Sequence, residues 1–362
     1  MALDRIQLAD FRNHRDSHVE GTAHFNLLVG ENGAGKTNVL EAISLLAPGR
    51  GLRRASLADM PAQDGRGGFA VSAALATQGD AVRLGTGVSS ERPGRRLVQV
   101  NGAASPALGL AEWLSIGWLT PAMDRLFSES AGARRRFLDR LVLALNPGHA
   151  ANATRYEGAL RERNSLLSDD RPPDPRWLDA TETQLAQAGA AIAQARQEAV
   201  EALDAVLEGL PEAPFARPAL KYRSGGPVTS EALAGALRDS RSRDRAAQRT
   251  LVGPHRDELD VTMAAKSQPA AECSTGEQKA MLIAIVLAHS QLLEGAGERR
   301  PRLLLLDEVA AHLDPVRREA LFDRLREGSA QVWLTGTETA PFAAILQEAA
   351  VWHVQGGNVV PA

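Results

Sequence analysis

The pattern of apolar and polar positions predicts an α/β protein in the first part of the chain. Residues 25–29 form a short, mostly apolar run typical of a buried strand, and residues 38–46 follow with apolar side chains at helical spacing. Residues 2–12 alternate as an edge strand does. Short alternating runs over 69–100 are broken by Gly and Pro and end at the hairpin signal Asn101-Gly102, which predicts an antiparallel sheet.

Longer helices are predicted from about Pro121 onwards. Helical periodicity covers residues 131–143, 150–167 and 176–210, and the proline-rich segment 169–175 separates the last two. The third helix carries apolar residues at seven-residue spacing, namely Leu178, Leu185, Ile192, Ala199 and Val206, with the small residues Ala188, Ala195 and Ala202 between them. This pattern favours a close antiparallel helix pair about 50 Å long. An ordinary amphipathic surface helix is the alternative.

The rest of the chain returns to mixed structure. Residues 211–256 contain short elements, and a strongly apolar helix is predicted over 280–293. Arg302–Leu306 includes four consecutive leucines, which is typical of a parallel strand covered on both faces. Residues 331–335 form the final predicted strand.

One loop between the first predicted buried strand and helix carries a strong chemical signal. It fits G-x-x-x-x-G-K-[ST], and its residues are Gly30, Glu31, Asn32, Gly33, Ala34, Gly35, Lys36 and Thr37. Glycines let successive N–H groups turn inward, and the helix N-terminus adds partial positive charge, so the loop can hold phosphates. Lys36 can reach the outer phosphates, and the Thr37 hydroxyl can bind Mg²⁺. A plain strand–helix connection is the alternative, but the context favours ATP and Mg²⁺ as cofactors.

Two carboxylates end the leucine-rich strand. Asp307 is expected to hold Mg²⁺, directly or through water, and Glu308 is expected to polarise the water that attacks the terminal phosphate. Two acids after an apolar run also occur at helix starts. Their combination with the phosphate-binding loop favours the catalytic interpretation.

A third segment, residues 274–279, reads Ser-Thr-Gly-Glu-Gln-Lys and precedes the apolar helix. Ser274 and Gly276 at a helix N-terminus can bind an anion. Ser274 with Glu277 three residues later also forms a capping-box pattern, and the two interpretations are compatible.

Composition narrows the class of protein. The 362 residues are 44% hydrophobic and 23% charged, which is ordinary for a globular protein. No apolar run reaches the length of a membrane span, and the N-terminus lacks the layout of a signal peptide. The single cysteine, Cys273, excludes an internal disulfide framework. We therefore expect a cytoplasmic protein without a membrane partner, and we expect Cys273 to be a buried small residue.

The net charge of −3 gives no general argument for nucleic-acid binding, so any such surface must be local. Residues 217–256 carry nine Arg and Lys side chains against three acidic ones. The candidate DNA contacts are Arg241, Arg243 and Arg245, together with Arg134, Arg135 and Arg136. Aromatic residues do not alternate with these arginines, so phosphate contact is the expected mode. A solvated face without a partner is the alternative.

The order of these motifs resembles an ATP-binding cassette of the SMC-like kind. Residues 274–279 take the place of its signature sequence, and residues 311–314 (Ala-His-Leu-Asp) take the place of its D-loop. Three further segments resemble the RecF family of bacterial DNA replication and repair proteins: Asp10-Phe11-Arg12-Asn13-His14, Arg134-Arg135-Arg136-Phe137-Leu138-Asp139 and Val252-Gly253-Pro254-His255-Arg256-Asp257-Glu258-Leu259.

The resemblance implies an α/β head of the ATP-binding-cassette type, with a mixed sheet, helices on both faces and an inserted helical arm. We expect the head at residues 1–125 and 251–362, as two lobes, and the arm with its basic connection at 126–250. Arg12 and Asn13 would join the nucleotide site, and Ser274 and Gly276 would close the site of a second copy.

The resemblance also implies a function. It implies an ATP-dependent homodimer that clamps single-stranded and double-stranded DNA at gaps or junctions, with slow, DNA-stimulated ATP hydrolysis as a switch. RecO and RecR would be partners, and RecA loading, replication restart and the SOS response would be supported.

Two departures from the cassette pattern concern γ-phosphate sensing. Residues 120–124 lack the usual Gln, and residues 335–338 lack the usual His. A transport ATPase is disfavoured because the helical insertion is too long and the signature differs from Leu-Ser-Gly-Gly-Gln. An SMC-like ATPase fused to a nuclease is disfavoured because only 48 residues follow Asp314. Intact Lys36, Thr37, Asp307 and Glu308 argue against a purely structural protein.

Overall fold

The computed structural model describes residues 3–76, 81–169, 171, 174–295 and 300–362. The chain folds as two compact units, which we call the first unit (Met1–Met123 with Leu293–Ala362) and the second unit (Asp124–Leu292). The predicted domains divide the chain differently. Residues 251–292, expected in the head, lie in the second unit. In that unit β10 (Glu258–Met263) pairs with β9 (Pro218–Arg223) of the predicted arm, β9 contacts α4 (Pro175–Glu208), and β10 contacts α2 (Ala131–Leu145).

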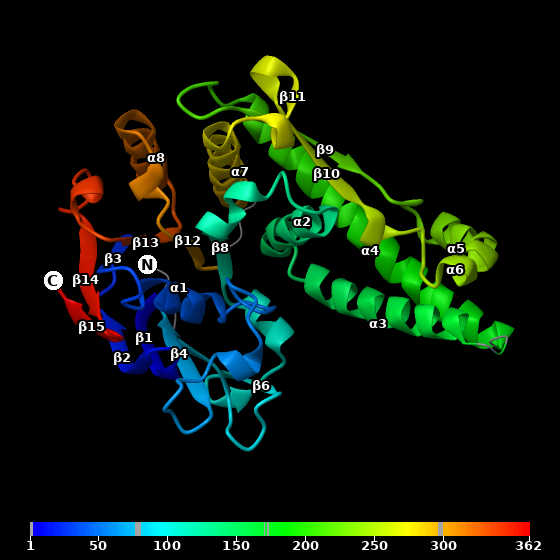
Figure 1. Cartoon of the computed structure of the whole chain (residues 1–362), viewed down its shortest axis with the longest axis horizontal. Helices are drawn as coiled ribbons and strands as arrows, with labels where there is room; N and C mark the ends of the chain where they lie inside the picture. Colours follow the sequence, from blue (N-terminus) through cyan, green and yellow to red (C-terminus); the bar gives the residue numbers. More distant parts are fainter. Residues whose placement is uncertain (1–2, 77–80, 170, 172–173, 296–299) are drawn as a thin grey trace. The chain divides into compact units, whose positions relative to one another are not determined.

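The first unit contains a mainly parallel six-stranded sheet with the order β15-β14-β3-β13-β12-β8 (Figure 1). Its strands are β3 (Phe25–Val29), β8 (Ser115–Leu119), β12 (Arg302–Leu306), β13 (Gln331–Gly336), β14 (Ala349–Gln355) and β15 (Asn358–Pro361). The predicted buried strands β3 and β12 are confirmed, and each pairs in parallel on both sides. The prediction that β13 is the final strand is wrong, because β14 pairs with β3 and β15 follows it.

The second sheet of the first unit is antiparallel, with the order β2-β1-β4-β5-β6-β7. Its strands are β1 (Leu3–Phe11), β2 (His14–Glu20), β4 (Phe69–Leu75), β5 (Val82–Val88), β6 (Arg96–Val100) and β7 (Ala103–Ala104). The predicted antiparallel sheet is confirmed, including the turn at Asn101-Gly102, where both residues have positive φ. The prediction of an edge strand is wrong, because β1 lies between β2 and β4.

One hydrophobic core joins both sheets to helix α1 (Lys36–Ser44). Leu303 and Leu305 of β12 belong to this core, whereas Leu304 and Leu306 are buried on the opposite face of the same strand. A strand buried on both faces needs apolar residues at every position, which explains the run of leucines. Helix α8 (Pro315–Glu327) begins after Asp314, whose side chain accepts a hydrogen bond from the Arg317 N–H.

The second unit is mainly helical (Figure 1). Its helices are α2 (Ala131–Leu145), α3 (His149–Ser168), α4 (Pro175–Glu208), α5 (Ser230–Asp239), α6 (Arg241–Ala247) and most of α7 (Thr275–Gly295). A three-stranded sheet has the order β11-β10-β9, with β9 at Pro218–Arg223, β10 at Glu258–Met263 and β11 at Gln268–Pro269. The predicted turn at 169–175 lies partly outside the described residues.

The predicted helix pair is present as α3 against α4. Four of the five seam residues on α4 are buried: Leu178, Leu185, Ile192 and Ala199. Tyr156 and Ala159 of α3 share a core with Leu185 and Ile192, and Leu233 and Leu237 of α5 complete it. No helix in the part of the chain that the structure describes has both the length and the apolar character needed to span a membrane.

Candidate nucleotide site and basic surface

The loop between β3 and α1 has backbone geometry that requires glycine. Gly35 precedes α1 with φ 119°, and a Cβ there would lie 2.8 Å from the side chains of Asn13 and His14. A Cβ on Gly30 would collide with the carbonyl oxygen of Val354. These two positions explain why the motif fixes glycine at both ends of the loop.

Lys36 is 4% exposed and folds back over the loop that precedes it. Its Nζ donates hydrogen bonds to the carbonyl oxygens of Gly30 (2.6 Å) and Glu31 (2.9 Å). Burial lowers the pKa of Lys36, while the charges of Glu308 and Asp307 oppose that shift. Thus the ammonium group is held inside the loop, where phosphate oxygens can replace the carbonyls as acceptors.

Asp307 lies where β12 ends and receives hydrogen bonds from two hydroxyl groups. Thr37 Oγ1 donates to Asp307 Oδ1 at 2.9 Å, and Thr335 Oγ1 donates to the same oxygen at 2.8 Å. Burial raises the pKa of Asp307 and the charge of Glu308 adds to this, whereas the two hydroxyl groups lower it. A carboxylate beside the Thr37 hydroxyl is a hard-oxygen donor pair, which fits the ligand preference of Mg²⁺.

Glu308 adopts a backbone conformation that is unusual for a non-glycine residue. Its φ is 54°, in the left-handed region. The Glu308 N–H donates to Thr335 Oγ1 at 2.9 Å, so the threonine holds both acidic residues in place. Strained backbone of this kind persists where the surroundings fix it, and it is common at functional sites.

Arg12 is fixed to a buried carboxylate. Its Nε and Nη2 bind the two oxygens of Glu41, which is 0% exposed, at 3.0 and 2.8 Å. Its Nη1 donates to the carbonyl oxygen of Asp59, and Arg53 binds Glu41 from a third segment. All three nitrogens of the Arg12 guanidinium therefore have protein partners in this structure.

Asn13 and His14 contact the backbone of the phosphate-binding loop. Asn13 Nδ2 donates to the carbonyl oxygen of Ala34 at 2.9 Å, and Asn13 Oδ1 accepts from Asn38 Nδ2 at 2.7 Å. The buried ring of His14 bonds the carbonyl oxygen of Gly35 through Nε2 at 3.1 Å. Burial lowers the pKa of His14. The β1–β2 hairpin therefore holds the backbone of the phosphate-binding loop in place through hydrogen bonds.

Two residues at the site, His14 and Thr335, had no role predicted from the sequence. Thr335 lies at the end of β13, which runs parallel to β12. The Thr335 hydroxyl therefore lies beside the carboxylates that follow β12. This signal was available, because the carboxyl ends of neighbouring parallel strands meet at one edge of a sheet. The residue also occupies the segment where the cassette pattern usually has its His.

The predicted signature segment opens α7 in the second unit. Ser274 and Gly276 are both exposed. Glu277 accepts from the Ser274 N–H at 2.9 Å, and the Glu277 N–H bonds back to Ser274 Oγ at 3.3 Å, which is the expected capping box. Cys273, immediately before it, is buried as expected.

Most of the candidate DNA-binding arginines have hydrogen-bond partners within the second unit. Arg134 binds both oxygens of Glu258, at 2.7 and 2.9 Å, and Arg135 donates to the carbonyl oxygen of Asp257 at 2.8 Å. Arg136 is exposed. The guanidinium of Arg134 is therefore committed to a partner within the second unit.

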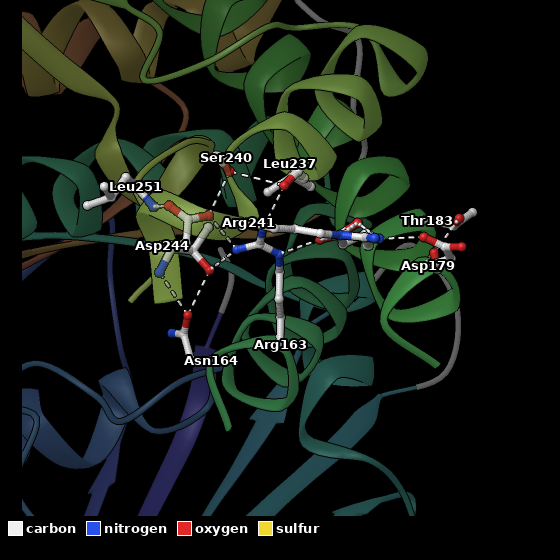
Figure 2. Close-up of polar contacts among 11 residues, drawn as sticks. Arg163, Asn164, Asp179, Thr183, Leu237, Ser240, Arg241, Asp244 and Leu251 are labelled. Atoms are coloured by element: carbon white, nitrogen blue, oxygen red, sulfur yellow. Dashed lines mark hydrogen bonds and ion pairs between the residues drawn. The ribbon is translucent and has the colours of Figure 1, made fainter. Parts of the chain in front are cut away.

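Arg241 is also committed, to a cluster of charged side chains around Arg163 (Figure 2). Arg241 binds Asp179 and Glu182, and Glu182 is also bound by Arg163 Nε at 3.0 Å. Arg245 donates to the carbonyl oxygen of Asp169 at 2.8 Å, whereas Arg243 is exposed. Of the three candidates on α6, Arg243 alone is exposed.

Two segments that carried the family resemblance meet at a third arginine. Arg196 of α4 binds both oxygens of Asp139, at 2.8 and 2.9 Å, and Asp257 Oδ2 at 2.7 Å. Burial raises the pKa of Asp139, but His149 and Arg196 outweigh it and lower the pKa to about 2. Arg196 therefore links the segments 134–139 and 252–259 through ion pairs with Asp139 and Asp257. These ion pairs connect α2, α4 and the residue that precedes β10.

Comparison with known proteins identifies the family. The family model described as "RecF/RecN/SMC N terminal domain" matches residues 2–358. The chain is 47% identical to the DNA replication and repair protein RecF of Mesorhizobium japonicum over 371 residues, which covers 99% of this chain and 97% of that protein. It is 46% identical to the RecF protein of Brucella suis over 372 residues, covering 99% and 96%.

Solved structures show the same fold. A structure of the recombination mediator protein RecF-ATPrS in the RecFOR pathway superposes with a TM-score of 0.87 at 23% identity, covering 99% of this chain and 97% of that one. The Smc head domain of Pyrococcus furiosus superposes with a TM-score of 0.57 at 16% identity, covering 100% and 96%. The fold is therefore that of RecF and SMC head domains, as predicted. The chain belongs to the RecF family of DNA replication and repair proteins.

Proposed function

We propose that the protein is an ATP-dependent, DNA-binding recombination mediator that acts as an ATP-closed homodimer at gapped DNA and at single-strand/double-strand junctions. The observation that carries this proposal is the meeting of Thr37, Asp307 and Glu308 beside the phosphate-binding loop, with Thr335 bonded to both acids. A site with this chemistry binds and hydrolyses a nucleoside triphosphate.

The residues of the nucleotide site have different roles. The loop N–H groups and Lys36 bind the β- and γ-phosphates. Thr37 and Asp307 would hold Mg²⁺, which would neutralise charge on the phosphates. Glu308 accepts a proton from the attacking water and orients it. Asn13 sets the loop geometry through Ala34, and Arg12 sets the position of α1 through Glu41.

The dimer is proposed from the family resemblance, which implies that the signature segment of one copy closes the nucleotide site of a second copy. Ser274 and Gly276 lie at the exposed N-terminus of α7, where they can donate to a γ-phosphate held by a second copy. ATP then joins two protomers through two composite sites with two-fold symmetry. Hydrolysis removes the γ-phosphate contacts and loosens the dimer, so slow, DNA-stimulated turnover acts as a switch.

DNA contact is proposed for four exposed arginines of the second unit. Arg238, Arg243 and Arg249 are exposed on α5, on α6 and just after α6, and Arg136 is exposed on α2. Arg134 and Arg241 instead hold the unit together through ion pairs. The exposed set would follow the phosphate backbone without reading bases.

The family supports the remaining parts of the proposal. Solved relatives are described as recombination mediators in the RecFOR pathway, which supports RecO and RecR as partners of this chain. We extend this to RecA loading in gap repair, replication restart and SOS induction in the cytoplasm.

Reversing two exposed arginines tests the DNA contact. Arg243→Glu with Arg249→Glu should weaken binding of a gapped duplex in the presence of ATP, and should reduce the slope of log K against log salt by about 2. The reason is that each lost phosphate contact removes one counterion-release term. Fluorescence anisotropy over a salt series measures both quantities.

The matched control places the same charge change on α3, as Arg155→Glu with Arg161→Glu, which are also exposed in the second unit. This control should keep the wild-type slope. An unchanged slope in the α6 variant, or an equal loss in both variants, would show that the DNA surface lies elsewhere.

A further inference from the structure

The signature serine is held by a carboxylate of its own helix. Ser274 Oγ donates to Glu277 Oε2 at 2.8 Å, and the Ser274 N–H donates to the same oxygen at 2.9 Å. A hydroxyl group has one proton to donate. The direction in which Ser274 presents its hydroxyl is therefore set by where the Glu277 carboxylate lies.

A lysine from a distant turn holds the other oxygen of that carboxylate. Lys266 Nζ donates to Glu277 Oε1 at 2.5 Å. Lys266 ends a short 3-10 turn between β10 and β11, and the next residue, Ser267, has a left-handed φ of 49°. The hydrogen bond from Lys266 and those from Ser274 lower the pKa of Glu277 to about 2, so the carboxylate is ionised at neutral pH.

An ionised carboxylate at this position has two opposite effects. It caps α7 and orients Ser274, but it also places negative charge beside the helix end that must receive a triphosphate. Like charges brought together at an interface oppose association, and a neighbouring cation offsets that repulsion. Lys266 is the cation bonded to Glu277, and it is one of only four lysines in the chain.

We propose that Lys266 and Glu277 form a positioning pair for the signature serine, in which Lys266 neutralises Glu277 so that α7 can accept the γ-phosphate bound by a second copy. This inference rests on the proposed ATP-closed dimer. It adds two residues that do not touch the reacting atoms and that act through Ser274. It also gives the β10–β11 turn a role in closing the site.

The pair is suited to a mutational test because it contributes little to folding. The Lys266 side chain is 53% exposed, and exposed ion pairs have small effects on stability. Lys266→Met keeps the apolar stem and removes the charge, and Lys266→Arg keeps the charge. Glu277→Gln keeps an oxygen acceptor for Ser274 while removing the negative charge.

Sedimentation velocity measures the ATP-dependent dimerisation of these variants. They are made in a Glu308→Gln background, which retains bound ATP. Lys266→Met should dimerise about tenfold more weakly than its parent, because Glu277 is left uncompensated. Lys266→Arg should match the parent. Lys266→Met combined with Glu277→Gln should recover parental dimerisation, which a purely structural role of Lys266 would not allow.

ATP affinity of the single protomer separates this effect from damage to the phosphate-binding loop, and it should be the same in all variants. Unchanged dimerisation of Lys266→Met, or failure of the double variant to recover, overturns the positioning pair and leaves the dimer intact. If the Glu308→Gln parent itself stays monomeric with ATP, the proposed dimer fails and the positioning pair fails with it.

Discussion

Lys36→Ala should bind ATP about 100-fold more weakly than the wild-type protein. Lys36 Nζ is the cation enclosed by the phosphate-binding loop, bonded to the carbonyl oxygens of Gly30 and Glu31. Truncation removes a charged contact to the outer phosphates. It also removes a positive charge that interacts with the carboxylates of Glu308 and Asp307. Isothermal titration calorimetry with Mg²⁺-ATP measures the effect.

Lys221→Ala is the matched control for this result, because Lys221 is an exposed lysine on β9 in the second unit. Its ATP affinity should equal that of the wild type. Wild-type affinity in Lys36→Ala would mean that the loop does not bind the triphosphate, and the proposed function would lose its basis.

Arg163→Met should destabilise the second unit by about 3–5 kcal/mol. Arg163 is 0% exposed and bonds four groups: Glu182 at 3.0 Å, Asp244 at 2.7 Å, Thr250 at 2.8 Å and the Leu237 carbonyl oxygen at 2.7 Å (Figure 2). These partners lie on α4, α5 and α6 and just after α6. Removal of the arginine takes away the ion pair that it forms with the buried Asp244 carboxylate.

Urea unfolding followed by circular dichroism measures this change. Arg161→Met on the same helix is the control, because the Arg161 side chain is 75% exposed and its nearest carboxylate oxygen lies 4.0 Å away. It should change the unfolding free energy by less than about 0.5 kcal/mol. Equal stability of the two variants would show that the buried cluster does not hold α5 and α6 on the α3–α4 pair.

Much of the fold could be predicted because strong local patterns coincide with burial. β3 and β12 are buried at nearly every position, so their apolar runs are unambiguous. The helix pair is also visible, because Leu185 and Ile192 repeat at the spacing that places them on one face. The phosphate-binding loop could be predicted from its glycines, because a Cβ at Gly30 or Gly35 would collide with neighbouring atoms.

β2 could not be predicted from hydrophobic alternation. Its inward positions are His14, Ser17 and Val19, and the first two are polar. They are buried because they bond backbone carbonyl groups of the phosphate-binding loop and of the turn at Gly357. Without β2 in view, β1 looks like an edge strand. Contacts with the phosphate-binding loop place polar residues at positions of β2 where a strand normally has apolar ones.

The candidate DNA contacts show a different limit. Sequence composition gives Arg241 and Arg243 equal weight, but Arg241 meets Asp179 and Glu182 about 60 residues upstream. Pairing of charges across such separations depends on tertiary structure and has no local signal. The same holds for Arg134 with Glu258. The sequence could therefore locate a basic region but not its free cations.

Sedimentation velocity of Glu308→Gln with ATP and a gapped duplex, alongside Lys36→Ala, tests whether ATP closes the dimer on DNA. Glu308→Gln removes the base that activates water and leaves Lys36, Thr37 and Asp307 in place, so bound ATP should persist. We expect Glu308→Gln to form a DNA-bound dimer only with ATP, and Lys36→Ala to stay monomeric. Two monomeric variants, or equal DNA binding by both without nucleotide, would contradict an ATP-closed clamp.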